Sequence, residues 1–258
     1  MKKILFILLT ISILNIKSQD LQWANSSTHT LKQGQKEIGL FSPLKIGMKN
    51  NMELTVFPVW FFILPNLELK KYWTEIKGIR IASTHKFSYP SLLYNMISKR
   101  GIAGILPETS KIPQMFKFNN NIMLGKDFSE HLSLTLTLGL DLCLSFGESD
   151  FPEIEYYLVY PRTYSYNNFL TPYTSLDFIG KITGNFYYNY NSTVFFLTQE
   201  YNGWLTEQKL KIQWNFAENW AVKGGTLFTY GDYPYGKGKG WFPIVDIMYK
   251  FGTPQSNN

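Results

Sequence analysis

The chain has 258 residues, enough for one large domain without requiring a second. Charged residues and aromatic residues each make up 17% of it, and this charge-poor, aromatic-rich composition excludes a disordered chain. The formal net charge of +6 comes from scattered lysines and arginines rather than a basic run, so we expect no nucleic-acid partner.

The N-terminus has the pattern of a secretory signal peptide. Two lysines at positions 2 and 3 precede a short apolar stretch over residues 4–16, and polar residues follow. We expect cleavage after Ser18, which leaves residues 19–258 as a single mature domain. Cys143 is the only cysteine, so no intramolecular disulfide can form.

In the first half of the mature chain, polar and apolar residues alternate in short blocks, which predicts β-strands. Residues 91–99 alone show a helical period, and residues 47–51 read as a tight turn. The strands are expected at residues 36–44, 52–62, 66–73, 78–88 and 112–124, with an additional N-terminal strand within residues 22–34.

Residues 132–144 give the clearest alternation in the chain. Every even position from Leu132 to Leu144 is leucine, while the odd positions carry small or polar residues such as Ser133, Thr135 and Asp141. Because side chains of a strand point alternately to its two faces, one face is aliphatic and the other polar. A length of about 13 residues suits a tilted membrane strand.

Alternation continues to the C-terminus, in strands expected at residues 176–189, 193–202, 209–216, 219–231 and 241–251. Tight links are predicted at residues 126–130, 189–192 and 217–219, and longer links at residues 89–111, 145–173 and 231–240. Short turns on one side and long loops on the other are typical of outer-membrane barrels.

These segments predict an all-β fold: an antiparallel up-and-down transmembrane barrel of about 12 strands (10–14), with short periplasmic turns and longer extracellular loops. Both termini in the periplasm require an even number of strands. Residues 154–160 could supply the twelfth strand, but we favour placing them in one outer loop and taking the additional strand from residues 22–34.

A soluble barrel also alternates, with its apolar face inward. Three features favour the membrane form. The polar faces are rich in Ser, Thr, Asn and Gly, with few charges. The chain closes on an aromatic strand ending at Phe251, and tryptophans lie near strand ends, as interfacial anchors do: Trp60, Trp73, Trp204, Trp220 and Trp241.

Several short segments stand near the start of the mature chain: residues 30–34 (Thr-Leu-Lys-Gln-Gly), 37–43 (Glu-Ile-Gly-Leu-Phe-Ser-Pro), Gly47, Glu53-Leu54 and Pro65-Asn66. Together they resemble the opening of uncharacterised, porin-like outer-membrane β-barrel proteins of Gram-negative bacteria. The last strand, ending at Phe251, is similar to the signal read by the barrel-insertion machinery, although residues 252–258 follow it. The resemblance implies the fold, the outer membrane as location, and the lipid and insertion machinery as partners. It carries no activity.

If the aliphatic faces meet lipid, a set of charged residues lines the lumen with a mildly positive balance. Such a balance predicts a weak anion preference in an open pore. A closed lumen in which these charges pair with one another is the alternative. The candidates are Lys117, Asp141, Asp177, Lys181, Lys209, Lys211, Lys223, Asp246 and Lys250.

Two serine–histidine pairs have a spacing that could support lipid hydrolysis, His131 with Ser133 and Ser83 with His85. Outer-membrane phospholipases carry a comparable pair two residues apart. Neither pair shows a third member in sequence, so both are interpreted as lumen-lining residues. The three histidines are far apart, so no metal site or other cofactor is expected. The glycine-rich residues 236–240 are interpreted as a mobile outer loop.

The leading hypothesis is a passive or substrate-selective pore for small polar solutes, with the solute unknown. The alternatives are a non-transporting envelope scaffold, adhesin or secretion accessory, and less favoured, an outer-membrane lipid hydrolase. An enzymatic activity is thus left open but not favoured.

Overall fold

The computed structural model describes residues 27–100, 106, 110–129, 131–198 and 203–253, so the expected signal peptide lies outside it. The described residues form a closed antiparallel barrel of 12 strands, in which β1 completes the ring against β12, and the predicted fold class is confirmed. The strands are β1 (Lys36–Gly39), β2 (Leu44–Met48), β3 (Met52–Val56), β4 (Asn66–Ile76), β5 (Ile79–Ser88), β6 (Gln114–Ser129), β7 (Leu132–Phe146), β8 (Leu170–Thr183), β9 (Phe186–Leu197), β10 (Gly203–Ala217), β11 (Trp220–Tyr233) and β12 (Gly236–Phe251).

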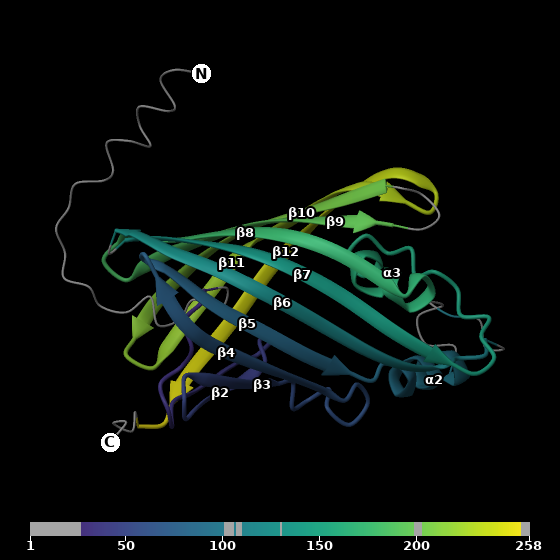
Figure 1. Cartoon of the computed structure of the whole chain (residues 1–258), viewed down its shortest axis with the longest axis horizontal. Helices are drawn as coiled ribbons and strands as arrows, with labels where there is room; N and C mark the ends of the chain where they lie inside the picture. The colour runs from purple at the N-terminus through teal and green to yellow at the C-terminus, as the bar shows by residue number, and fades with distance from the viewer. Residues whose placement is uncertain (1–26, 101–105, 107–109, 130, 199–202, 254–258) are drawn as a thin grey trace, which may run out of the picture.

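The two ends of the barrel differ. At the end where β1 starts and β12 stops, which we call the turn end, residues 49–51, 77–78, 184–185 and 218–219 form connections of two or three residues. The opposite loop end carries the two long connections with helices α2 (Ser91–Arg100) and α3 (Tyr160–Asn168). Figure 1 shows both helices together at the end opposite the C-terminus. The expected asymmetry of short turns and long loops is confirmed.

The additional strand expected within residues 22–34 is wrong for its described part, because residues 27–35 form no strand. The count of 12 is met because the segment expected as one strand at residues 36–44 breaks into β1 and β2. Pro43 cannot donate a ladder hydrogen bond. Asp246 instead accepts hydrogen bonds from the Phe41 backbone N–H and the Ser42 hydroxyl, which hold residues 40–43 as a turn.

The single strand expected at residues 176–189 is also divided. Gly184 has a φ of 47° and forms a two-residue turn with Asn185, between β8 and β9. Such turns need positive φ, which glycine adopts without strain. The tight link expected at residues 189–192 is therefore wrong, since these residues lie within β9.

Residues 231–240 are not the long, mobile loop expected from their glycines. β11 continues to Tyr233 and β12 begins at Gly236, so only two residues connect them. Tyr157 packs against this part of β12, which leaves no room for a side chain at Gly238. A Cβ on Gly238 would lie 2.5 Å from the ring of Tyr157. A long connection is confirmed within the expected residues 145–173, but it covers only residues 147–169, since β7 ends at Phe146 and β8 begins at Leu170. Residues 154–160 contain no strand, as expected, whereas helix α3 was not predicted.

The polar faces of the strands point into the barrel and the apolar faces point out. Along β7, Ser133, Thr135 and Thr137 are buried, whereas Leu138 on the other face is 52% exposed. The other long strands repeat this arrangement, with Ile122, Leu210 and other large apolar side chains exposed on the outer surface. This is the reverse of a soluble barrel, whose apolar side chains face inward.

The wall is low on one side. β1, β2 and β3 have only four or five residues each, whereas β6 to β12 have 12 to 16. β1 pairs only with Met248–Phe251 at the end of β12, so a four-residue seam closes the ring. Beyond these short strands the apolar surface continues in exposed loop side chains: Leu40, Phe41, Val59 and Phe62.

Candidate functional site

A cavity of about 810 Å³ lies in the loop half of the lumen. Long strands supply its wall, and the loop after β3 and the two helices contribute Phe57, Trp60, Leu93 and Tyr166. Its charged lining has five cationic side chains against three carboxylates, so positive charge prevails at the wall. The cations are Lys86, Lys117, Arg162, Lys209 and Lys211, and the carboxylates are Glu68, Asp141 and Asp177.

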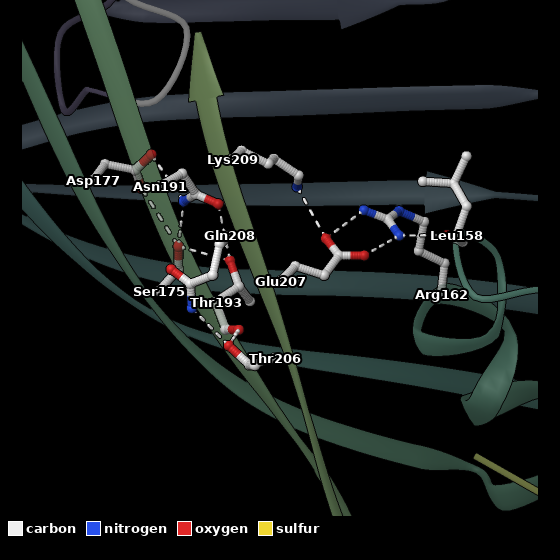
Figure 2. Close-up of polar contacts among 10 residues, drawn as sticks. All are labelled: Leu158, Arg162, Ser175, Asp177, Asn191, Thr193, Thr206, Glu207, Gln208 and Lys209. Atoms are coloured by element: carbon white, nitrogen blue, oxygen red, sulfur yellow. Dashed lines mark hydrogen bonds and ion pairs between the residues drawn. The ribbon is translucent and has the colours of Figure 1, made fainter. Parts of the chain in front are cut away.

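Helix α3 lies across the lumen and is tied to two sides of the wall. Lys117 on β6 donates a hydrogen bond of 2.6 Å to the backbone carbonyl of Arg162. The guanidinium of Arg162 binds both carboxylate oxygens of Glu207 on β10, at 2.6 and 2.8 Å (Figure 2). Because the two strands lie on different sides of the ring, Arg162 fixes α3 as a bar across the passage.

The two wall residues that bind α3, Lys117 and Glu207, each make a further ion pair. Lys117 contacts Asp141 at 2.7 Å, and Lys209 contacts Glu207 at 3.1 Å. Burial would lower the pKa of Arg162, but the attraction of Glu207 outweighs it and raises that pKa, so the helix keeps its positive charge at any physiological pH. Planar guanidinium and carboxylate groups match in a two-bond geometry, which makes this contact stronger than a single hydrogen bond.

Aromatic packing fixes the orientation of α3. Tyr160 and Tyr164 are almost completely buried, against a cluster that includes Phe195, Leu205 and Tyr233 from β9, β10 and β11. Pro161 lies in the first turn of the helix, where its missing N–H costs no hydrogen bond within the helix. These contacts turn the polar side of the helix toward the cavity.

A network of uncharged polar groups coats the cavity wall between the charges. The amide of Asn191 donates to Ser175 at 2.6 Å and to Asp177 at 2.9 Å, and Thr193 bonds to Ser175 at 3.0 Å (Figure 2). Across the adjoining strands β6 to β8, Tyr173 and Asp141 accept from the amide of Asn119. A wall of amides and hydroxyls replaces the hydrogen bonds that a polar solute makes with water.

Residues 27–35, which we call the N-terminal segment, lie inside the turn half of the lumen. Thr28 has no exposed surface and Ser27 only 2%. The ammonium of Lys70, itself 3% exposed, donates to the backbone carbonyls of Ser27 and His29, and Glu53 accepts from the backbone N–H of Leu31. Charged wall residues thus bind the backbone of this segment.

Two wall glycines make room for the N-terminal segment. A Cβ on Gly47 would lie 2.0 Å from the carbonyl oxygen of Lys32, and one on Gly125 would lie 2.5 Å from the hydroxyl of Thr28. A larger residue at either position would require the segment to shift. Gly125 is the next lumen-facing position after Met123 of the cavity wall, so the segment lies directly beyond the cavity floor.

The sequence-predicted lumen residues fall into two groups. Lys117, Asp141, Asp177, Lys209 and Lys211 line the cavity. The others lie in the turn half: Lys223, Asp246 and Lys250 are buried beside β1, and Lys181 lies over the ring of Tyr187.

Arg162, Glu207 and the N-terminal segment were not predicted as parts of the site. Glu207 has the same parity as Lys209 and Lys211, but β10 begins at Gly203, six positions before the expected start at residue 209, so Glu207 lay outside the expected strand.

The two serine–histidine pairs lie on opposite faces of the wall. Ser133 points into the lumen and is 1% exposed, as expected. The expectation that Ser83 and His85 line the lumen is wrong: they alternate with the cavity-lining residues Thr84 and Lys86 and so face outward. The described residues contain no cluster of three metal-ligating side chains. Among them there is also no helix long and apolar enough to cross a membrane.

No protein family and no curated protein matches the sequence. Among solved structures, the barrel is similar to the outer membrane channel DcaP of Acinetobacter baumannii, with a TM-score of 0.38 and 7% identity. The similarity covers 93% of this chain and 68% of the channel.

Proposed function

We propose that this protein is an outer-membrane barrel that passes small polar solutes. The observation that carries this proposal is the reversed polarity of a closed barrel, whose exposed outer surface is apolar and whose interior is a polar, charged cavity of about 810 Å³. Apolar side chains facing out are stable when hydrocarbon surrounds them, and a polar lumen is the interior of a solute pore.

Exposed tryptophans support a membrane position. Trp73 and Trp220 lie toward the turn end, and Trp204 and Trp241 lie toward the loop end. Tryptophan collects at both water–lipid interfaces of membrane proteins, so these residues form the two girdles of an embedded barrel. By the usual arrangement of such barrels, the short turns face the periplasm and the helices the exterior.

The charge of the cavity suggests which solutes pass. Five cations against three carboxylates line it, and Lys86 and Lys211 have no ion-pair partner within 4 Å among the described residues. A surplus of positive charge in a confined lumen favours anions. We therefore expect a weak preference for small anionic solutes, which pass beside α3 and leave through the turn end once the N-terminal segment withdraws.

The second candidate function is a non-transporting scaffold. The observation in its favour is the N-terminal segment, which fills the turn half of the lumen and binds its charged wall. A barrel closed permanently in this way supports other envelope components without conducting.

Single-channel conductance in planar bilayers separates the two functions. The refolded mature chain should give discrete current steps in potassium chloride, with a reversal potential shifted toward that of chloride under a salt gradient. A protein that inserts but gives no current at any voltage would leave the scaffold as the remaining function.

Membrane position needs its own measurement. The folded barrel should migrate faster than the heated chain on a detergent gel and should fractionate with the outer membrane. A mature chain that stays monodisperse in buffer without detergent would contradict the membrane position and, with it, both functions.

A further inference from the structure

Three polar side chains meet on the outward face of the barrel wall: Ser83 and His85 from β5 and Asn120 from β6. Of these, Ser83 is only 7% exposed. Their neighbours in sequence, Thr84, Lys86 and Asn121, line the lumen cavity, and this alternation places the three on the opposite face. His85 and Asn120 are cross-strand partners in the ladder between β5 and β6. Asn120 is remote from Ser83 and His85 in sequence, and the register between β5 and β6 brings it next to His85.

The three groups form a hydrogen-bonded chain in the order of a catalytic triad. The hydroxyl oxygen of Ser83 lies 3.2 Å from Nε2 of His85, and Nδ1 of His85 lies 2.8 Å from the side-chain oxygen of Asn120. Asn120 accepts from Nδ1–H, so the tautomer that fits leaves Nε2 free to accept the serine proton. A serine, a histidine base and a residue that orients the histidine are the parts of acyl-transfer enzymes on unrelated folds.

The indole of Trp73 completes the arrangement on the neighbouring strand β4. Its N–H donates to the hydroxyl of Ser83 at 2.9 Å. An acyl oxygen that becomes negative beside the serine oxygen comes within reach of this donor, which is the requirement for stabilising an oxyanion. Trp73 is also 60% exposed near the turn end, where tryptophan side chains lie at the depth of lipid headgroups.

The surroundings of the triad are apolar on the side of β6 and β7, while on the side of β4 the ladder partner of Ser83 is Lys71. Phe118 and Ile122 flank Asn120 on the same face of β6, and Leu138 lies beyond them on β7, all of them exposed. Polar and ionisable groups on a lipid-facing surface are costly, and where they persist they mark function. The acyl chains of a lipid that reaches this site from the bilayer would contact these apolar side chains.

We propose that Ser83, His85 and Asn120 form an esterase site for the acyl chains of glycerophospholipids. Ser83 attacks the ester carbonyl carbon while its proton passes to Nε2 of His85. The carbon–oxygen bond to the glycerol breaks, and His85 returns the proton to the glycerol oxygen. Water then attacks the acyl-serine, again through His85, and releases a fatty acid and restores the serine hydroxyl. The products are a lysophospholipid and a free fatty acid.

This inference goes beyond solute passage and shares only the membrane position with it. The test uses the full mature chain, refolded in phosphatidylethanolamine vesicles that contain a lipid with a radiolabelled acyl chain. Wild type should release labelled fatty acid, and Ser83→Ala and His85→Ala should each lose at least about 100-fold of that rate. Asn120→Ala should lose less, and Asn120→Asp should restore much of the loss because a carboxylate orients the histidine equally well.

Two matched serines serve as controls. Ser133 stands two residues from His131 but faces the lumen, and Ser192 faces outward and bonds to Gln208 without a histidine. Ser133→Ala and Ser192→Ala should retain the wild-type rate. Faster migration of the unheated band on a detergent gel shows that each variant is folded.

An apolar sulfonyl fluoride gives a second readout, because it should label Ser83 covalently and the label is located by mass spectrometry. Folded wild type with neither lipid turnover nor a Ser83 adduct overturns the proposal. So does turnover that survives Ser83→Ala, or cleavage of a water-soluble ester without cleavage of phospholipid. Since bilayer current is recorded separately, a conducting barrel without hydrolysis contradicts only the esterase, and a hydrolysing barrel without current contradicts only the pore.

Discussion

Glu207 is the carboxylate on which the bar across the lumen depends. Its side chain has no exposed surface and holds both Arg162 on α3 and Lys209 on its own strand. A buried charge that loses its partner keeps the cost of leaving water, so such groups are sensitive to substitution. Arg162 is partly exposed and can recover some hydration, which moderates that cost.

Glu207→Gln should loosen α3 and make the lumen more positive by one charge. We expect the unfolding free energy to fall by about 2–3 kcal/mol, toward the low end for a broken buried pair. The reversal potential in a salt gradient should shift further toward chloride. Glu218→Gln is the control, because Glu218 lies exposed in the turn of the same hairpin. Equal shifts in both variants would contradict the role of Glu207.

Lys211 tests the positive lining of the cavity. It has no ion-pair partner within 4 Å among the described residues, so Lys211→Glu changes the lumen charge by two without orphaning a carboxylate. The anion preference should disappear or reverse, as measured by the reversal potential. Lys237→Glu, at an exposed position of the β11–β12 hairpin, should leave the preference unchanged. An unchanged reversal potential in Lys211→Glu would mean that ions do not pass this cavity.

At the scale of elements, the N-terminal segment is the part most open to manipulation. It passes over Gly47 and Gly125, and the Cβ of Thr28 lies 3.2 Å from where a Cβ on Gly125 would be. Two cysteines at positions 28 and 125 are therefore close enough for a disulfide after a small adjustment.

Thr28→Cys with Gly125→Cys, in a Cys143→Ala background, should lock the segment when oxidised. We expect conductance to drop on oxidation and to return on reduction, because the segment can then leave the lumen. The single variants Thr28→Cys and Gly125→Cys should not respond to oxidant. Equal conductance of the oxidised and reduced double variant would show that the segment does not control the passage.

His29 gives the same segment a pH dependence. Burial and the charge of Arg80 lower the pKa of His29, with partial compensation by Asp127 and a further small decrease from Lys70. Because the pKa of His29 is lowered when the segment lies in the lumen, protonation of His29 favours release of the segment. Docking is therefore strongest above the ordinary pKa of histidine and weakens as the pH falls below it.

Conductance should therefore rise between pH 7 and pH 5, and His29→Gln should remove this dependence. A rise that persists unchanged in His29→Gln would assign the effect to other groups.

The long strands could be predicted from sequence because the outer face of this barrel is apolar and its lumen is polar. Residues 132–144 show this alternation without interruption, and β7 has the expected orientation. Two-residue turns were harder to predict. On both sides of Gly184–Asn185, polar residues alternate with apolar or aromatic ones. This alternation alone therefore did not reveal the turn between β8 and β9.

The parts of the site that were missed depend on tertiary contacts. Residues 27–35 are polar and look like a surface loop, but wall residues that include Lys70, Glu53 and Arg80 bind them inside the barrel. Arg162 and Glu207 are 45 residues apart in sequence and come together only when α3 folds inward. Asn120 was likewise invisible as a partner of His85, since cross-strand register is set by the whole sheet.

At the scale of the whole molecule, the ring is weakest around β1. Neighbouring long strands pair over ten residues or more, whereas β1 meets β12 over four residues and β2 over only two. Local opening starts where few hydrogen bonds must break.

Hydrogen–deuterium exchange should therefore be fastest, among strand amides, at Lys36–Gly39 and Met248–Phe251, and slowest in β6 and β7. A disulfide between positions 38 and 249, which are ladder partners, should slow exchange at the seam. Uniform exchange around the ring would contradict this weak point.

If the barrel lies in a bilayer as proposed, the low wall of β1 to β3 also has a consequence for the lipid beside it. Five strand residues cover about 17 Å, little more than half of a hydrocarbon core about 30 Å thick. A bilayer meets such a mismatch by compressing, which draws headgroups toward its centre. The ladder row that contains Ser83 runs through Lys71 to Met52, at the edge of that short wall. In compressed lipid the ester groups would lie at the level of Ser83. The short strands β1 to β3 would thereby bring phospholipid esters within reach of the site on the longer strand β5.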